Sequence, residues 1–188
     1  MTKAELISEL DHVNHSKEKR THYSNYFISH PQAVPVLLEV AFNSKIKTSY
    51  KAAWVLEFLC SSNIDHIAPH LDFFTKHLAS VTFDSSKRPM AKICERIALD
   101  YYKHNNRLLK KGLTPLLKER IIEACFDWMI QNEKVAVKAY SMNALYLFGT
   151  DQDWIHPELV SILKKDFSIQ SAAFRARARH ILKKLKAL

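Results

Sequence analysis

Small and apolar residues recur at three- and four-residue steps within residues 51–60, a spacing that places them on one face of a helix. The repeating positions are Ala52, Val55, Leu56 and Leu59. Ala53 lies beside them and is small enough for a neighbouring helix to approach closely. The pattern predicts the inner helix of a helical hairpin.

The same pattern returns further along the chain. Residues 137–148 and 174–185 carry good copies, and residues 94–99 carry a poorer one. Equivalent positions in successive copies lie 42, 47 and 37 residues apart, which is the period of a repeat built from two helices. Four of the six prolines have a similar spacing, and each opens an apolar helical stretch, where the missing N–H costs nothing. They are Pro31, Pro69, Pro115 and Pro157. These prolines predict the outer helices.

The two best copies resemble HEAT-type repeats, in which a proline-started outer helix is followed by a Val-Arg pair, a small residue and an Ala-Leu pair. Their counterparts here are Val137-Lys138, Ser141 and Ala144-Leu145, and then Phe174-Arg175, Ala178 and Leu182. The resemblance covers about residues 31–188, except that the unit at 82–99 departs from it. It implies an all-α fold, an α-α superhelix of the HEAT or ARM type with about five helical hairpins.

We expect one domain over residues 1–188, with residues 1–30 as N-terminal capping helices and residues 31–188 as HEAT-like hairpins. In the cap, Thr2 and Glu5 fit a capping box. The repeat helices are expected at about 31–43, 47–62, 67–81, 87–105, 115–132, 134–148, 157–167 and 171–187.

Two local features of these helices are predicted in more detail. Ser85 or Ser86 is expected to cap a helix that carries Pro89 in its first turn. Gly112 is expected to end a helix in the left-handed conformation, and Gly149 to end the helix before it.

Composition supports the helical interpretation and limits the function. Only two glycines are present, and no stretch alternates polar and apolar residues, which argues against sheets. No apolar run of about 18 residues and no signal peptide is evident, so we expect a soluble, cytoplasmic protein without a membrane partner. Three cysteines, far apart and each within an apolar helical pattern, are expected to be reduced core residues. They are Cys60, Cys94 and Cys125. Among the tryptophans, Trp54 and Trp128 are expected to pack within the stack and Trp154 to be exposed.

No motif in the sequence predicts catalysis. His66 and His70 have metal-ligand spacing, but Pro69 between them separates their faces. Residues 85–92 are similar to the Ser-Ser-x-Met-Pro-x-Lys loop of the fumarase and adenylosuccinate lyase superfamily, with the Met-Pro order reversed and the flanking glycine absent. We therefore reject lyase activity and expect no catalytic residue, cofactor or metal.

Positive charge is concentrated at one end of the chain. The net charge is +9, yet residues 1–158 hold 20 Lys and Arg against 18 Asp and Glu, whereas residues 159–188 hold 8 against 1. The basic side chains flank the apolar stripe of the last helix, and the candidates for polyanion binding are Arg175, Arg177, Arg179, Lys183 and Lys184. Two interpretations stay open: a soluble face on a terminal capping helix, or a site for nucleic acid.

Stacked hairpins leave an extended surface, so the first functional hypothesis is a non-enzymatic interaction module that presents a concave face to a protein partner. The alternative is a nucleic-acid-binding or DNA-repair-like protein, because the chain is similar in repeat type, size and basicity to HEAT-like DNA glycosylases. None of its positions is assigned to their catalytic Asp or Trp. A groove lined by Lys51, Arg88, Lys138 and Arg175 would favour nucleic acid; a neutral groove would favour protein.

Overall fold

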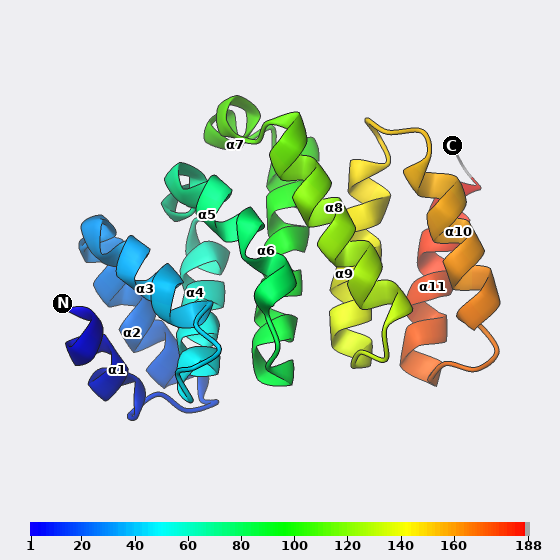
Figure 1. The fold of residues 1–188 in the computed structure, drawn as a ribbon. Helices are drawn as coiled ribbons and strands as arrows, with labels where there is room; N and C mark the ends of the chain where they lie inside the picture. Colours follow the sequence, from blue (N-terminus) through cyan, green and yellow to red (C-terminus); the bar gives the residue numbers. More distant parts are fainter. Residues whose placement is uncertain (187–188) are drawn as a thin grey trace.

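The computed structural model describes residues 1–186, and within them every regular element is a helix, with 76% of the chain helical (Figure 1). The helices form five successive pairs. The pairs are α1 (Lys3–Leu10) with α2 (Lys17–Ser29), α3 (Val34–Ala41) with α4 (Ser49–Ser62), α5 (Leu71–Lys76) with α6 (Asp84–Tyr102), α8 (Pro115–Ile130) with α9 (Val135–Phe148), and α10 (Ile155–Asp166) with α11 (Ala172–Leu185). A short helix, α7 (Arg107–Gly112), lies between the third and fourth pairs.

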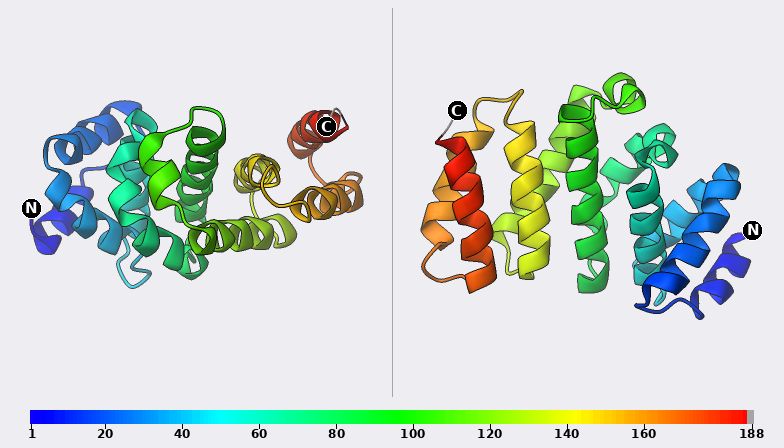
Figure 2. Two further views of the ribbon diagram at one scale, coloured as in Figure 1. Left: turned by 90° about the horizontal axis from the view of Figure 1, so that it is seen from above. Right: turned by 180° about the vertical axis from the view of Figure 1, so that it is seen from behind.

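The pairs stack into two layers. The inner layer holds α2, α4, α6, α9 and α11, which run side by side in the same direction, each packed on the next (Figures 1 and 2). The outer layer holds α3, α5, α8 and α10, which lie in front of the inner layer in Figure 1 and behind it in the right-hand view of Figure 2. Side chains between the layers form one continuous apolar core. The predicted α-α superhelix is confirmed.

Small residues lie where the inner helices meet, as the repeat pattern predicts. Ala52, Ala53, Ser141 and Ala178 have no exposed surface. Large side chains fill the space between the layers, and those of Phe27, Phe74, Phe148 and Phe174 are fully buried. All three cysteines are free and buried, as expected, and burial raises the pKa of the Cys60 thiol well above its usual range.

The start of α6 differs from the prediction. The helix begins at Asp84, so Ser85 and Ser86 lie inside it and cap nothing, and Pro89 is its sixth residue. A proline at this position leaves the carbonyl of Ser85, four residues earlier, without its helical donor. The indole Nε1 of Trp54 on α4 donates to that carbonyl at 3.1 Å. A tertiary contact therefore replaces the bond that the proline removes.

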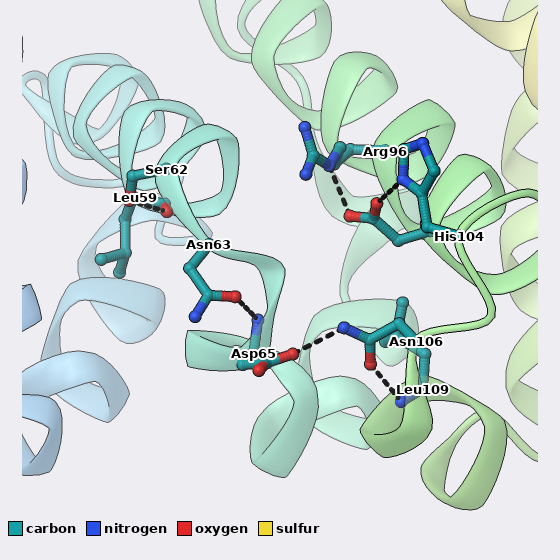
Figure 3. Close-up of polar contacts among 9 residues, drawn as sticks. Leu59, Ser62, Asn63, Asp65, Arg96, His104, Asn106 and Leu109 are labelled. Carbon is teal, nitrogen blue, oxygen red and sulfur yellow. Dashed lines mark hydrogen bonds and ion pairs between the residues drawn. The ribbon is translucent and has the colours of Figure 1, made fainter.

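Helix α7 was not predicted as a separate element. The chain leaves α6 through Asn105, the one non-glycine residue within 1–186 with a positive φ, 52°. Gly112 ends α7 without a positive φ, so the predicted left-handed glycine is wrong. Asn106 caps α7 by accepting from the backbone N–H of Leu109, and its amide donates to Asp65 at 2.7 Å (Figure 3).

Glycine 149 ends α9 as predicted, but for a different reason from the expected one. Its φ is −62°, which any residue adopts. A Cβ atom there would lie 2.1 Å from the ring of His156. That ring is held by a 2.9 Å hydrogen bond to the carbonyl of Tyr146. Close packing of the histidine, not backbone conformation, requires the glycine.

A buried lysine joins α8 to the loop before α10. The ammonium of Lys118 donates to Asp151 at 2.6 Å and to the hydroxyl of Tyr101 at 3.0 Å, and Tyr102 also donates to Asp151. Burial disfavours the charged lysine, but these hydrogen bonds outweigh it and raise the pKa of Lys118. Burial likewise opposes ionisation of Asp151, yet the bonds from Lys118 and Tyr102 lower the pKa of its carboxyl.

Asp151→Asn is expected to cost about 1 kcal/mol or less at neutral pH, since the Asp151 side chain is 41% exposed and solvent screens the pair. The folded pKa of Asp151 lies below its ordinary value of 3.8, so the contribution is complete above that pH and is lost as the pH falls through the folded value. Urea unfolding should thus show a lower free energy of unfolding for Asp151→Asn than for the wild type at pH 7, and this difference should shrink towards about pH 3. Asp153→Asn, which removes an exposed carboxylate outside any ion pair among residues 1–186, is the control.

Candidate functional site

Polar and aromatic side chains form a continuous strip across the exposed side of the inner layer. We call it the inner strip. Side-chain contacts connect it from α2 to α4, from α4 to α6 and from α6 to α9. They are Arg20, Lys51, Trp54, Phe58, Arg88, Lys92, Glu95, Arg96, Tyr140, Asn143 and Arg177.

Where α4 meets α6, one buried carboxylate forms ion pairs with two cations. Glu57 is only 2% exposed, and its carboxylate accepts from Arg88 Nη2 at 2.9 Å and from Lys92 Nζ at 2.7 Å. The cations are four residues apart on α6, so they lie on one helix face. Both remain more than a third exposed. One carboxylate therefore positions two cations and neutralises only one of them.

Further along α6 the arrangement repeats. Asp100 is 4% exposed and accepts from Arg96 and His104 (Figure 3). Arg96 is four residues beyond Lys92, which continues the basic row towards the end of α6. Arg88, Lys92 and Arg96 thus form a row of half-exposed cations along one helix, supported from below by acids.

Glu95 connects α6 to the last two inner helices. Asn143 on α9 donates to it at 2.7 Å. Burial is the main influence and raises the pKa of Glu95, while Asn143, Arg177 and Lys92 oppose that rise. The guanidinium of Arg177 on α11 is close enough for its charge to act on this carboxylate. The strip therefore reaches the C-terminal helix.

Aromatic rings lie among these cations. The guanidinium of Arg20 on α2 stands 4.4 Å from the centre of the Phe58 ring. Trp54 meets Tyr50 edge to face, and Tyr140 on α9 is half-buried. A hollow of about 390 Å³ lies beside the strip, near the first residues of α6 and α9. Its lining is His15, Arg20, Trp54, Asp84, Ser85, Arg88, Lys134 and Ala136. Trp54 packs against the core, as expected, and its partly exposed side also lines this hollow.

Of the four cations predicted to line a groove, two lie on the inner strip. Lys51 donates to the carbonyl of Asp11 at 3.0 Å, and Arg88 pairs with Glu57. Lys138 does not lie on the inner strip, because it is only 3% exposed and its ammonium donates to the carbonyl of Met129 at 2.8 Å. It is two positions from Ala136 and from Tyr140 on α9, so it points to the opposite side of the helix, towards Asp166. That prediction is wrong.

The five candidate cations of the last helix do not form one patch. Arg177 belongs to the inner strip, and Lys184 lies 5.2 Å from the ring of Tyr146 on α9. Arg179 and Lys183 instead line an apolar hollow of about 630 Å³ at the end of the stack. Arg175 is half-buried, and its Nε has no hydrogen-bond partner among residues 1–186.

The sequence interpretation missed Lys92 and Arg96. A visible signal existed, because these residues follow Arg88 at steps of four. It was hidden because the copy of the repeat in this unit is poor. The sequence interpretation placed Trp54 within the stack and did not single out Phe58 or Tyr140, since the exposure of an apolar side chain cannot be read from hydrophobicity alone.

The residues considered for chemistry do not converge. His66 ends the short 3₁₀ turn Ile64–His66, and His70 ends the next, Ala68–His70. Within residues 1–186 no group of three or more His, Cys, Asp and Glu side chains is placed to hold a metal ion. In the stretch that is similar to a lyase loop, Lys87 pairs with Glu133, and Arg88 and Lys92 pair with Glu57.

Comparison with known families agrees with this architecture. The family model of the HEAT repeat domain matches residues 6–185. The chain belongs to the HEAT-repeat family. No curated protein and no solved structure matches it. The family match begins within α1, so it includes the first helix pair of this HEAT-repeat protein, which lacked a visible repeat pattern.

HEAT repeats make this chain a helical-repeat interaction module, a class in which stacked hairpins present extended surfaces to other macromolecules. None of the helices within residues 1–186 is both long and apolar enough to cross a bilayer.

Proposed function

We propose that the protein is a non-enzymatic interaction module whose inner strip binds a nucleic-acid strand. The observation that carries this proposal is the row of half-exposed cations on α6, held in place by buried Glu57 and Asp100. Cations outnumber carboxylates along the strip, so an anionic partner would be attracted to it.

The cations of the strip are positioned before any partner arrives. Arg88 and Lys92 are fixed by their bonds to Glu57, and each keeps a third or more of its side chain in solvent. Ordering them therefore takes little further conformational entropy on binding. Because two cations share one acid, a phosphate group can contact the pair without displacing the carboxylate.

The aromatic side chains favour a single strand over a duplex. Bases of a single strand can stack on exposed rings, whereas those of a duplex are already stacked. Trp54 and Phe58 on α4 lie beside the cations of α2 and α6, which is the combination of stacking and charge that such sites use.

A protein partner is the second candidate, and the outer layer favours it. Ile130 is 66% exposed and Trp154 is 55% exposed, and both lie near α8 and α10, away from the cations of the inner strip. A nucleic-acid strand on the strip would leave these apolar side chains in water.

The test compares two variants that lose the same charge. Lys51→Gln/Arg88→Gln/Arg177→Gln changes the inner strip, and Lys92 remains to neutralise Glu57. Lys164→Gln/Arg179→Gln/Lys183→Gln changes the hollow at the end of the stack. In fluorescence anisotropy with single-stranded DNA and RNA, the first triple should lower the slope of log affinity against log salt by about 2. The second should leave the slope close to that of the wild type.

Three other results would contradict the proposal. Loss of binding in the second triple alone would assign the site to the end of the stack. Unchanged binding in both triple variants would mean that the binding site lies on neither of these basic surfaces. No binding by the wild type at low salt would remove nucleic acid as the partner and favour a protein.

A further inference from the structure

The outer layer carries a groove of about 460 Å³ between α8 and α10. These helices each pack on α9 but hardly on each other, which leaves a space between them. The rings of Phe126 and Trp154 both line it, stacked with their centres 5.5 Å apart. Ile122, Ile130 and Ile162 complete the apolar lining. We call this surface the acidic groove, for the reason that follows.

Carboxylates follow the apolar residues along the groove. On α8, the apolar row Ile122, Phe126 and Ile130 has steps of four residues, and so does the acidic row. The acidic row is Glu119, Glu123 and Asp127, and Glu158 faces it from α10. Equal steps of four make the two rows neighbouring parallel ridges on one helix.

None of these four carboxylates forms an ion pair within residues 1–186. The chain has a net charge of +9, and its cations elsewhere hold Glu57, Asp100 and Glu133. Four unpaired acids around exposed apolar side chains are not needed for stability, because like charges at steps of four repel each other. The arrangement is complementary to a partner with the opposite charge.

We propose that the acidic groove docks a basic amphipathic helix of a protein partner. The lining of α8 from Glu119 to Ile130 has the length of about three helical turns. A docked helix would place apolar side chains at steps of three and four on Ile130 and Trp154, and its Lys or Arg side chains beside the acidic row. Exposed apolar patches bordered by charge are typical of such sites.

This site is independent of the inner strip. The strip is formed by side chains of the inner helices, and the groove lies between α8 and α10 of the outer layer. Figures 1 and 2 show these two layers of helices. The two surfaces have opposite charge, so neither competes for the ligand of the other. The protein would thereby connect an anionic partner and a basic one.

The experiment uses the full chain and a synthetic amphipathic helix of leucine and lysine, about four turns long. Glu119→Gln/Glu123→Gln/Asp127→Asn should weaken binding of this peptide about tenfold or more. Asp11→Asn/Glu18→Gln/Glu39→Gln removes the same charge from the residue that follows α1, from α2 and from α3, and it should leave binding within about twofold of the wild type. Ile130→Gln/Trp154→Gln tests the apolar lining and should also weaken binding about tenfold. Circular dichroism verifies the fold of each variant.

Two results would overturn the proposal. Equal weakening in both acidic triples would mean that the peptide responds to net charge and not to the groove. The second result would be self-association of the protein alone that depends on its concentration. If the Glu119, Glu123 and Asp127 changes abolished it, the groove would be assigned to a second copy of this chain. Measurement by analytical ultracentrifugation at low and high salt distinguishes that case.

Discussion

Ala53→Arg is expected to lower the free energy of unfolding by several kcal/mol, the largest effect of any single change considered for this protein. Ala53 has no exposed surface and lies where α4 meets its neighbours in the inner layer. An arginine there would bring an unpaired cation and a long side chain into a contact with no room for either. Urea denaturation followed by far-ultraviolet circular dichroism measures the change.

The matched control is Ser61→Arg, on the same helix but exposed to solvent. It adds the same side chain and charge, and it should change the free energy of unfolding by no more than about 0.5 kcal/mol. Equal stability of Ala53→Arg and wild type would mean that the inner helices do not pack through this position.

Removing both partners of Glu57 is expected to cost about 3–5 kcal/mol, the range found when a buried charge is left unpaired. Glu57 is 2% exposed and is bound by Arg88 and Lys92. Arg88→Gln or Lys92→Gln alone should cost only about 1 kcal/mol, because the remaining cation still neutralises the carboxylate. The double variant should therefore be much less stable than the sum of the singles implies.

A double-mutant cycle measures this coupling from urea unfolding of the four proteins. Adding Glu57→Gln to the double variant is the decisive control, because it removes the unpaired charge and should restore most of the lost stability. Additive single effects, with no rescue by Glu57→Gln, would show that the two cations act independently of the acid.

The repeat period was predictable from sequence because packing limits the residues that fit. Inner helices can approach closely only where side chains are small, so Ala52, Ser141 and Ala178 recur at regular distances and are all fully buried. The prolines add a second signal. Pro31 opens the short 3₁₀ turn Pro31–Ala33 before α3, Pro115 opens α8, and Pro157 lies in the first turn of α10.

The errors arose where one part of the chain depends on a distant part. Pro89 could occupy the interior of α6 because Trp54, on another helix, satisfies the carbonyl that proline leaves free. Lys138 was expected at a surface, yet it is buried because Met129 supplies a carbonyl for its ammonium. No local pattern contains these partners.

The candidate sites were only partly predictable for a related reason. The basic residues of the last helix were visible as a cluster in sequence, but a helix distributes neighbours around its axis, so Arg177 and Arg179 face different surfaces. The acidic row on α8 has a regular step of four and could have been noticed. Its meaning depends on the space beside α10, which sequence does not show.

The last helix pair is attached to the rest of the protein mainly through α9. Helices α10 and α11 pack on each other and on α9. In a stack of this kind each unit has its own opening equilibrium, and a terminal unit with one interface opens most readily. Opening of this pair would separate Arg177 from the α6 cations and Glu158 from the acidic row, so it would dismantle both surfaces at once. A partner bound to either surface would hold the pair closed. The first partner to bind would supply the free energy needed to close the pair, which would weaken its affinity. The second partner would find the pair already closed and would bind more tightly.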